Sequence, residues 1–86
     1  MKIASAGTYE SNDCLVTIKE SDELIIEIQS IVYAQFKDQI EKVIKDTLLE
    51  LKIKNLYISC NDKGALDYTI KARLLTAIKR MSENHA

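Results

Sequence analysis

Apolar residues recur along the chain with two different periods, and the change of period predicts its secondary structure. Residues 14–19 and 23–29 alternate apolar and polar side chains, which is the pattern of strands with one buried face. The polar residues 20–22 between them favour a turn, so we expect the two strands to form an antiparallel hairpin. Residues 55–60 alternate in the same way and predict a third strand.

Two longer segments change to a spacing of three and four residues, which predicts amphipathic helices. We expect the first helix over residues 33–51, with Ser30 as its N-cap, because a serine hydroxyl can accept an N–H bond of the first turn. Its apolar stripe comprises Tyr33, Phe36, Ile40, Val43, Ile44, Leu48 and Leu51. The second helix is expected to begin near residue 65, and residues 82–86 form a polar, flexible tail.

The expected order of elements is ββαβα in a single domain that spans residues 1–86. Two amphipathic helices must bury their apolar stripes, and one face of a sheet can cover both of them. We therefore expect an α+β fold, a two-layer sandwich with a three-stranded, mainly antiparallel sheet and both helices on one face. A chain of this length buries only about 60–65% of its unfolded surface, so we expect a thin core.

Charge and composition exclude several classes of protein. Twelve basic and thirteen acidic residues leave a net charge of −1, which does not fit nucleic-acid binding. No apolar run approaches the roughly 20 residues of a membrane helix, and the first residues show no apolar signal segment. We expect a cytoplasmic protein with reduced Cys14 and Cys60, both at inward strand positions where cysteine acts as a small core residue.

The histidine content restricts the chemistry that the chain can perform. Its single histidine is His85, near the C-terminal end, where chains usually fray. A serine or cysteine nucleophile needs a positioned base, and two thiols with one histidine do not make a conventional zinc site. We therefore expect neither catalytic residues of that kind nor a metal. The chain either works with carboxylates and lysines or performs no chemistry with its own side chains.

Residues 5–13 fit neither period and are small and polar. On composition alone, a plain N-terminal lead-in is the simpler interpretation of such a segment, although functional loops have the same character. Residues 6–13, however, read Ala-Gly-Thr-Tyr-Glu-Ser-Asn-Asp. This sequence resembles the Ala-Gly-Thr-Leu-Glu-Ser-x-Asp segment of the citrate lyase acyl carrier proteins, the gamma subunits of citrate lyase.

Two further segments carry the same resemblance in the same order. Residues 62–73 are similar to the family's Asp-Lys-Gly-Ala-Leu-Asp-Cys-x-x-Arg-Ala-Arg, with Tyr68 in place of the cysteine and Lys71 in place of an arginine. Residues 35–40, Gln-Phe-Lys-Asp-Gln-Ile, look like the family's Gln-Phe-Gly-Asp-x-Ile. The resemblance therefore covers essentially the whole chain.

The resemblance implies a carrier rather than an enzyme. Members of the family are phosphoproteins that hold a 2'-(5''-phosphoribosyl)-3'-dephospho-coenzyme A prosthetic group on a serine, which aligns with Ser11. Residues 1–13 are therefore expected to form an N-terminal segment and attachment loop. Its thiol carries acetyl and then citryl as thioesters during citrate fermentation. The implied partners are the alpha subunit (an acyl transferase), the beta subunit (a citryl lyase) and the holo-carrier transferase. The lack of any histidine other than His85 agrees with this role, because a cofactor can supply the chemistry while the protein supplies placement.

Alternatives remain open at this point. The carrier of malonate decarboxylase resembles this family and uses the same type of group, and an unmodified protein-interaction module is a different class of function. Lys63, Lys71 and Arg73 are candidates for contacts with phosphate or with a partner, since cations suit phosphate oxygens. A structural interpretation of the same region is that Asn61 or Asp62 caps the second helix.

Overall fold

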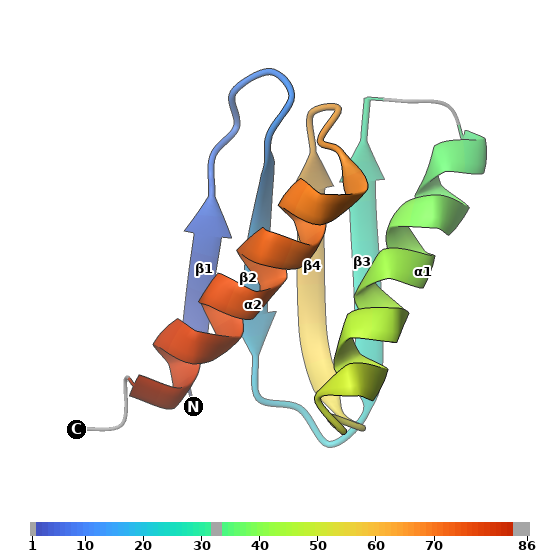
Figure 1. The fold of residues 1–86 in the computed structure, drawn as a ribbon. Coiled ribbons are helices and arrows are strands. Elements are labelled where there is room, and N and C mark those ends of the chain that lie inside the picture. Colours follow the sequence, from blue (N-terminus) through green and yellow to red (C-terminus); the bar gives the residue numbers. More distant parts are fainter. Residues whose placement is uncertain (1, 32–33, 84–86) are drawn as a thin grey trace.

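A computed structural model of the chain describes residues 2–31 and 34–83, in which a four-stranded sheet carries two helices on one face (Figure 1). The strands are β1 (Ile3–Gly7), β2 (Cys14–Lys19), β3 (Leu24–Ser30) and β4 (Leu56–Asp62). The helices are α1 (Ala34–Glu50) and α2 (Asp67–Glu83). The prediction of an α+β sandwich with both helices in one layer is confirmed.

The order of the strands is β1-β2-β4-β3, which differs from the prediction in two respects. The sheet has four strands rather than three, because residues 3–7, expected in the N-terminal lead-in, form an edge strand. The predicted hairpin between β2 and β3 is wrong, since β4 lies between them. The β1–β2 and β2–β4 pairs are antiparallel and the β3–β4 pair is parallel, so the sheet is mainly antiparallel as predicted.

The edge strand β1 was not evident in the sequence because its residues are small. Ala4 and Ala6 alternate with Ser5, and this pattern carries little of the apolar bulk that marks a strand. Ala6 is nevertheless buried and Ala4 packs against the core, because α2 crosses over this part of the sheet (Figure 1). The small side chains of β1 let the helix approach the sheet.

The position of β4 explains why the expected hairpin does not form. Parallel strands cannot be joined by a tight turn, and α1 provides the longer crossover between β3 and β4. The central place suits β4, whose inward residues Leu56, Ile58 and Cys60 are all buried, whereas β3 lies at an edge and is largely exposed. The alternation of a strand shows which face is inward but does not show which strand is its neighbour.

The hydrophobic core fills the space between the sheet and the two helices. Its fully buried aliphatic side chains come from both layers and include Val16, Ile18, Ile44, Ile58, Ile70 and Leu74. Cys14 and Cys60 are free thiols and buried, as their inward strand positions predict. The contact with the Cys14 thiol and burial raise the pKa of Cys60, so this thiol stays protonated. Both cysteines are core residues.

Several predicted boundaries differ from the observed ones. Ser30, the predicted N-cap of the first helix, is the last residue of β3, and its hydroxyl donates to a carboxylate of β4 at 2.9 Å. Residues 32–33, through which it would meet the start of α1, lie outside the described residues. The second helix extends to Glu83, so its last residues overlap the tail predicted over residues 82–86. Tyr33, the expected start of the first helix, and His85 lie outside the described residues.

Candidate functional site

Ser11 lies at the tip of the loop that joins β1 to β2. The Asp13 N–H donates to the Glu10 carbonyl at 3.1 Å, which closes a four-residue turn with Ser11 at its second position. Asn12, at the third position, has a φ of 66°, as a type II turn requires. Ser11 is exposed, and its hydroxyl has no hydrogen-bond partner among the described residues. The turn therefore presents a free hydroxyl to solvent.

The strand before this loop depends on a glycine. Gly7 has a φ of 106°, and a Cβ added to it would lie 1.8 Å from the Cys14 carbonyl oxygen. The next residue, Thr8, donates its N–H to that same oxygen at 3.2 Å. The main chains of β1 and β2 approach so closely here that only a residue without a side chain fits. This close approach sets the direction in which the loop leaves the sheet.

Asp13 is the centre of the polar contacts beneath the turn. Its carboxylate accepts hydrogen bonds from the Thr8 hydroxyl and the Cys14 N–H, both at 2.7 Å. It also accepts two bonds from Arg73 of α2, from Nε at 3.0 Å and from Nη2 at 2.9 Å. The Arg73 and Thr8 hydrogen bonds lower the pKa of Asp13 from 3.8 to about 2. The carboxylate is thus ionised, and its charge is offset by the guanidinium.

The loop between β4 and α2 lies directly beside the Ser11 turn. The Asn12 N–H donates to the Lys63 carbonyl at 2.8 Å, and the Lys63 N–H donates to the Asp13 carbonyl at 2.9 Å. Gly64 has a φ of 93°, and a Cβ added to it would lie 3.6 Å from the Asn12 side-chain oxygen. Two loops that are about fifty residues apart in the sequence are therefore joined by main-chain hydrogen bonds.

Asp62 anchors this second loop from inside the protein. Its side chain is only 1% exposed and accepts hydrogen bonds from the Ser30 hydroxyl at 2.9 Å and the Ala65 N–H at 2.8 Å. Of the two residues predicted to cap the second helix, Asp62 thus binds an N–H of the approach to the helix, two residues before α2 begins at Asp67. A buried carboxylate held by two donors fixes the loop on the end of β4.

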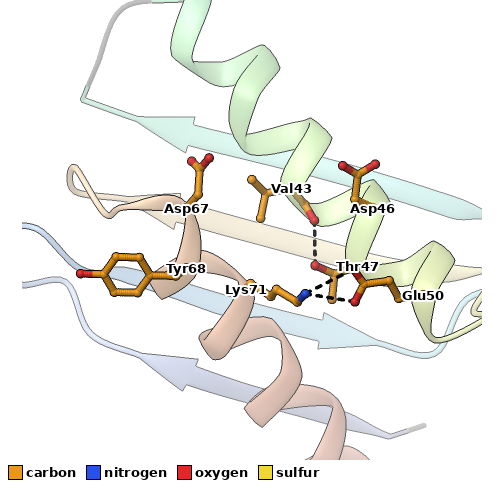
Figure 2. Close-up of a pocket in the computed structure, with 7 residues that line it drawn as sticks. All are labelled: Val43, Asp46, Thr47, Glu50, Asp67, Tyr68 and Lys71. Carbon is orange, nitrogen blue, oxygen red and sulfur yellow. Dashed lines mark hydrogen bonds and ion pairs between the residues drawn. The ribbon is translucent and has the colours of Figure 1, made fainter.

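Lys71 points elsewhere, into a groove between the two helices (Figure 2). The groove has a volume of about 320 Å³, and its lining residues are Val43, Asp46, Thr47, Glu50, Asp67, Tyr68 and Lys71. The Lys71 ammonium lies 3.0 Å from a carboxylate oxygen of Glu50 on α1. Both side chains are about half exposed, so this ion pair is a solvated link between helices.

The structure thus separates the candidates that the sequence put forward. It brings Arg73 and the main chain of Lys63 to the Ser11 loop, and it commits Lys71 to the helix groove. Sequence reasoning did not assign a role to Thr8 or Asp13, although both belong to the segment that carries the resemblance. Their positions in that segment, three residues before and two residues after the serine, could have indicated a role in holding the serine loop.

Comparison with known proteins defines the class of this fold. A family model described as "Malonate decarboxylase delta subunit (MdcD)", with the short name ACP, matches residues 1–81. A chain in the crystal structure of a Pseudomonas malonate decarboxylase hetero-tetramer in complex with malonate matches with a TM-score of 0.76 at 20% identity. The match covers 93% of this chain and 84% of that one. The class is that of small α+β acyl carrier proteins.

Curated relatives narrow the class. The citrate lyase acyl carrier protein of Halothermothrix orenii is 49% identical over 83 residues, which cover 95% of this chain and 88% of that protein. The citrate lyase acyl carrier protein of Treponema denticola is 46% identical over 80 residues, which cover 93% and 92%. The chain belongs to the citrate lyase acyl carrier protein family, as the resemblance predicted. Acyl carrier proteins are generally non-catalytic subunits.

Within residues 2–31 and 34–83, neither helix is long and apolar enough to cross a membrane. In the same part of the chain, no three side chains of histidine, cysteine, aspartate or glutamate gather where they could hold a metal ion.

Proposed function

We propose that this chain is the acyl carrier subunit of a citrate lyase complex and that Ser11 is its modified residue. In this proposal a 2'-(5''-phosphoribosyl)-3'-dephospho-coenzyme A group is joined by a phosphodiester to the Ser11 hydroxyl. When bound, this group supplies a terminal thiol that carries acyl groups as thioesters. The alpha subunit acts as the acyl transferase and the beta subunit as the citryl lyase, and this chain catalyses neither step.

The observation that carries the proposal is the exposed, unbonded Ser11 hydroxyl at the tip of an ordered turn. A hydroxyl that accepts a large group must be reached by a transferase, and the attached group needs room outside the protein. The other serines that competed for this role are engaged elsewhere. Ser30 and Ser21 form hydrogen bonds through their hydroxyls, and Ser5 and Ser59 lie within strands of the sheet.

The charges around Ser11 suit an attached phosphodiester. Asp13, the carboxylate two residues after Ser11, is paired with Arg73, which offsets a negative charge that would otherwise act on the phosphate. Lys63 follows on the adjacent loop, and its ammonium forms no ion pair within the described part of the chain. Lys63 is therefore the group that would hold phosphate oxygens, while Arg73 is occupied by Asp13. The buried cysteines offer no accessible thiol for the same purpose.

Intact-mass measurement tests the attachment. The chain is co-expressed with the holo-carrier transferase and with the enzyme that makes the activated precursor of the prosthetic group. We expect a single adduct on the wild type and none on Ser11→Ala. Ser21→Ala is the matched control, because Ser21 also lies in a loop, and it should be modified like the wild type. An unchanged wild-type mass, or an adduct that survives Ser11→Ala, contradicts the proposal.

A second candidate is the carrier of malonate decarboxylase, because the matching family model and the similar solved structure both bear that name. Identities of 46–49% to citrate lyase carriers, against 20% to the malonate decarboxylase chain, favour citrate lyase. The modified chain should support oxaloacetate formation from citrate when mixed with citrate lyase alpha and beta subunits. Activity with malonate decarboxylase subunits alone would select the second candidate, and an unmodified mass in the native host would select an interaction module.

A further inference from the structure

We propose that Arg73 is a positioning residue for the attachment of the prosthetic group, because it holds the Ser11 turn in the conformation that the transferase uses. This inference rests on the proposed function of Ser11 and deepens it. Arg73 touches neither Ser11 nor the incoming group in this role. It acts through Asp13, two residues after the serine.

The contact between Arg73 and Asp13 has the geometry of a positioning device. Two parallel hydrogen bonds of 3.0 and 2.9 Å join the guanidinium to both carboxylate oxygens. Such a bidentate pair fixes orientation as well as distance, which a lysine ammonium cannot do. The Asp13 side chain is 14% exposed, so water competes with this pair less than it does at an open surface.

Asp13 transmits this restraint to the turn on both sides. Its side chain binds Thr8, where the loop leaves β1, and the N–H of Cys14, where the loop enters β2. Its main-chain N–H closes the turn on Glu10. If Arg73 is removed, the carboxylate keeps only local partners and loses its link to α2. The Ser11 turn then keeps its main-chain hydrogen bonds with Lys63 but loses the directional restraint from α2.

The predicted consequence is a smaller fraction of molecules with Ser11 in the reactive arrangement. In the attachment step, the Ser11 oxygen forms a bond to phosphorus of the activated precursor. The phosphoanhydride bond of that phosphorus breaks, its leaving group departs with the electron pair, and the hydroxyl proton passes to a base of the transferase. If only a tenth of the molecules hold the turn correctly, the apparent KM for the carrier rises about tenfold while kcat is unchanged.

The test combines modification kinetics with amide hydrogen exchange on the full chain. For Arg73→Gln we expect the KM for the carrier to rise about tenfold, with kcat within about twofold of the wild type. The amides of Asn12 and Asp13 should exchange about tenfold faster, while the amide of Ile58 in β4 is unchanged. Arg73→Lys keeps the positive charge but cannot form the bidentate contact, so its KM and exchange rates should lie between those of the wild type and Arg73→Gln.

Arg80→Gln is the matched control for a general loss of packing. Arg80 lies on the same helix, and its guanidinium donates to the Ser5 carbonyl of β1 at 2.8 Å, away from the Ser11 turn. For Arg80→Gln we expect the KM for the carrier and the exchange rate of the Asn12 amide to stay within about twofold of the wild-type values. All variants are compared at a temperature at which circular dichroism shows them to be folded.

Two results would overturn the inference. One is an Arg73→Gln variant with wild-type KM and wild-type exchange at Asn12 and Asp13. The other is an Arg80→Gln variant with the same losses as Arg73→Gln. If the wild type itself is not modified, the proposed function fails. Amide exchange then decides by itself whether Arg73 holds the turn.

Discussion

The two sides of α2 are attached to the rest of the molecule by different kinds of contact. On one side, Arg73 reaches the β1–β2 loop through a bidentate ion pair, and main-chain hydrogen bonds join that loop to the loop that leads into α2. On the other side, α2 faces α1 across an open groove (Figure 2). The polar links there are the solvated Lys71–Glu50 pair and an exposed hydrogen bond from the Gln39 amide to Asp67 at 2.8 Å. Beneath both sides the helix buries Ile70, Leu74 and Ala77.

The comparison shows that different interactions hold a helix and a loop in place. Apolar burial is non-directional, so it fixes α2 on the sheet without specifying a rotamer or a turn. Hydrogen bonds to a carboxylate are directional, so they can define the conformation of a loop that has little apolar surface. The loop with Ser11 therefore depends on a few specific groups, whereas the helix groove tolerates change.

The largest effect is expected for Gly7→Ala, which acts at the base of the loop. The new Cβ would overlap the Cys14 carbonyl oxygen, and the φ of 106° is unfavourable for alanine. We expect the free energy of unfolding to fall by about 3–5 kcal/mol, a large part of the total for a domain of this size. Urea unfolding followed by circular dichroism measures the change.

Gly64→Ala is the matched control for that substitution. It has a similar φ of 93°, but the new Cβ would have ordinary contact distances, with the nearest atom at 3.6 Å. Only the conformational cost of about 1–2 kcal/mol should remain. Equal losses for the two variants would show that the close approach at Gly7 has no effect of its own.

An intermediate effect is expected for Asp13→Asn, and it should depend on pH. The folded-state pKa of Asp13 is about 2 against an ordinary value of 3.8, so the ionised carboxylate stabilises the folded state. This stabilisation is complete above about pH 4 and is lost as the pH falls towards 2. At pH 7 we expect Asp13→Asn to cost about 2 kcal/mol, the range for hydrogen bonds to charged groups.

The measurement compares urea unfolding of the wild type and Asp13→Asn at several values between pH 7 and pH 2. The difference between the two proteins should shrink between pH 4 and pH 2, since the wild-type carboxylate becomes protonated there. A difference that stays constant over this range would mean that the charge of Asp13 does not stabilise the fold. The groups that face this carboxylate are Arg73, Thr8 and the Cys14 N–H.

The smallest effect is expected for Lys71→Gln on the groove side of the helix. Lys71 and its partner Glu50 are 42% and 59% exposed, and exposed pairs contribute less than about 1 kcal/mol. A double-mutant cycle with Glu50→Gln should give a coupling energy of about 0.5 kcal/mol or less, reduced further by salt. A coupling as large as the effect of Asp13→Asn would remove the contrast between the two sides of α2.

The sequence alone was sufficient for those features that depend on local periodicity. The alternation in residues 14–19 predicted β2 and the inward side chains of Cys14, Val16 and Ile18, and all three are buried. The spacing of apolar residues likewise predicted two helices in one layer. A side chain's repeat along the chain reports directly on which face of an element is buried, so these predictions needed no knowledge of the neighbours.

Only part of the candidate site could be predicted from the sequence. Ser11 was identified by resemblance, because the serine stands in a segment of specific order. The contact of Arg73 with Asp13 could not be predicted from the sequence, because the two residues are separated by 60 positions. A periodic pattern shows which face of an element is buried, but it does not show which distant residue a side chain will contact. Arg73 was expected among residues that meet phosphate or a partner, and the structure places it on the carboxylate beneath the turn.

Only the tertiary structure decided how the elements are combined. Local patterns allowed β2 to pair with β3, whereas the fold inserts β4 between them and adds β1 at the edge. That choice brings the end of β4 beside the β1–β2 loop, and with it Lys63, Gly64 and the helix that bears Arg73. Pairing and loop contacts are long-range interactions whose energy depends on the whole packed arrangement. The sequence by itself was sufficient to select Ser11 as the candidate residue. The order of the strands determined which residues hold its loop in place.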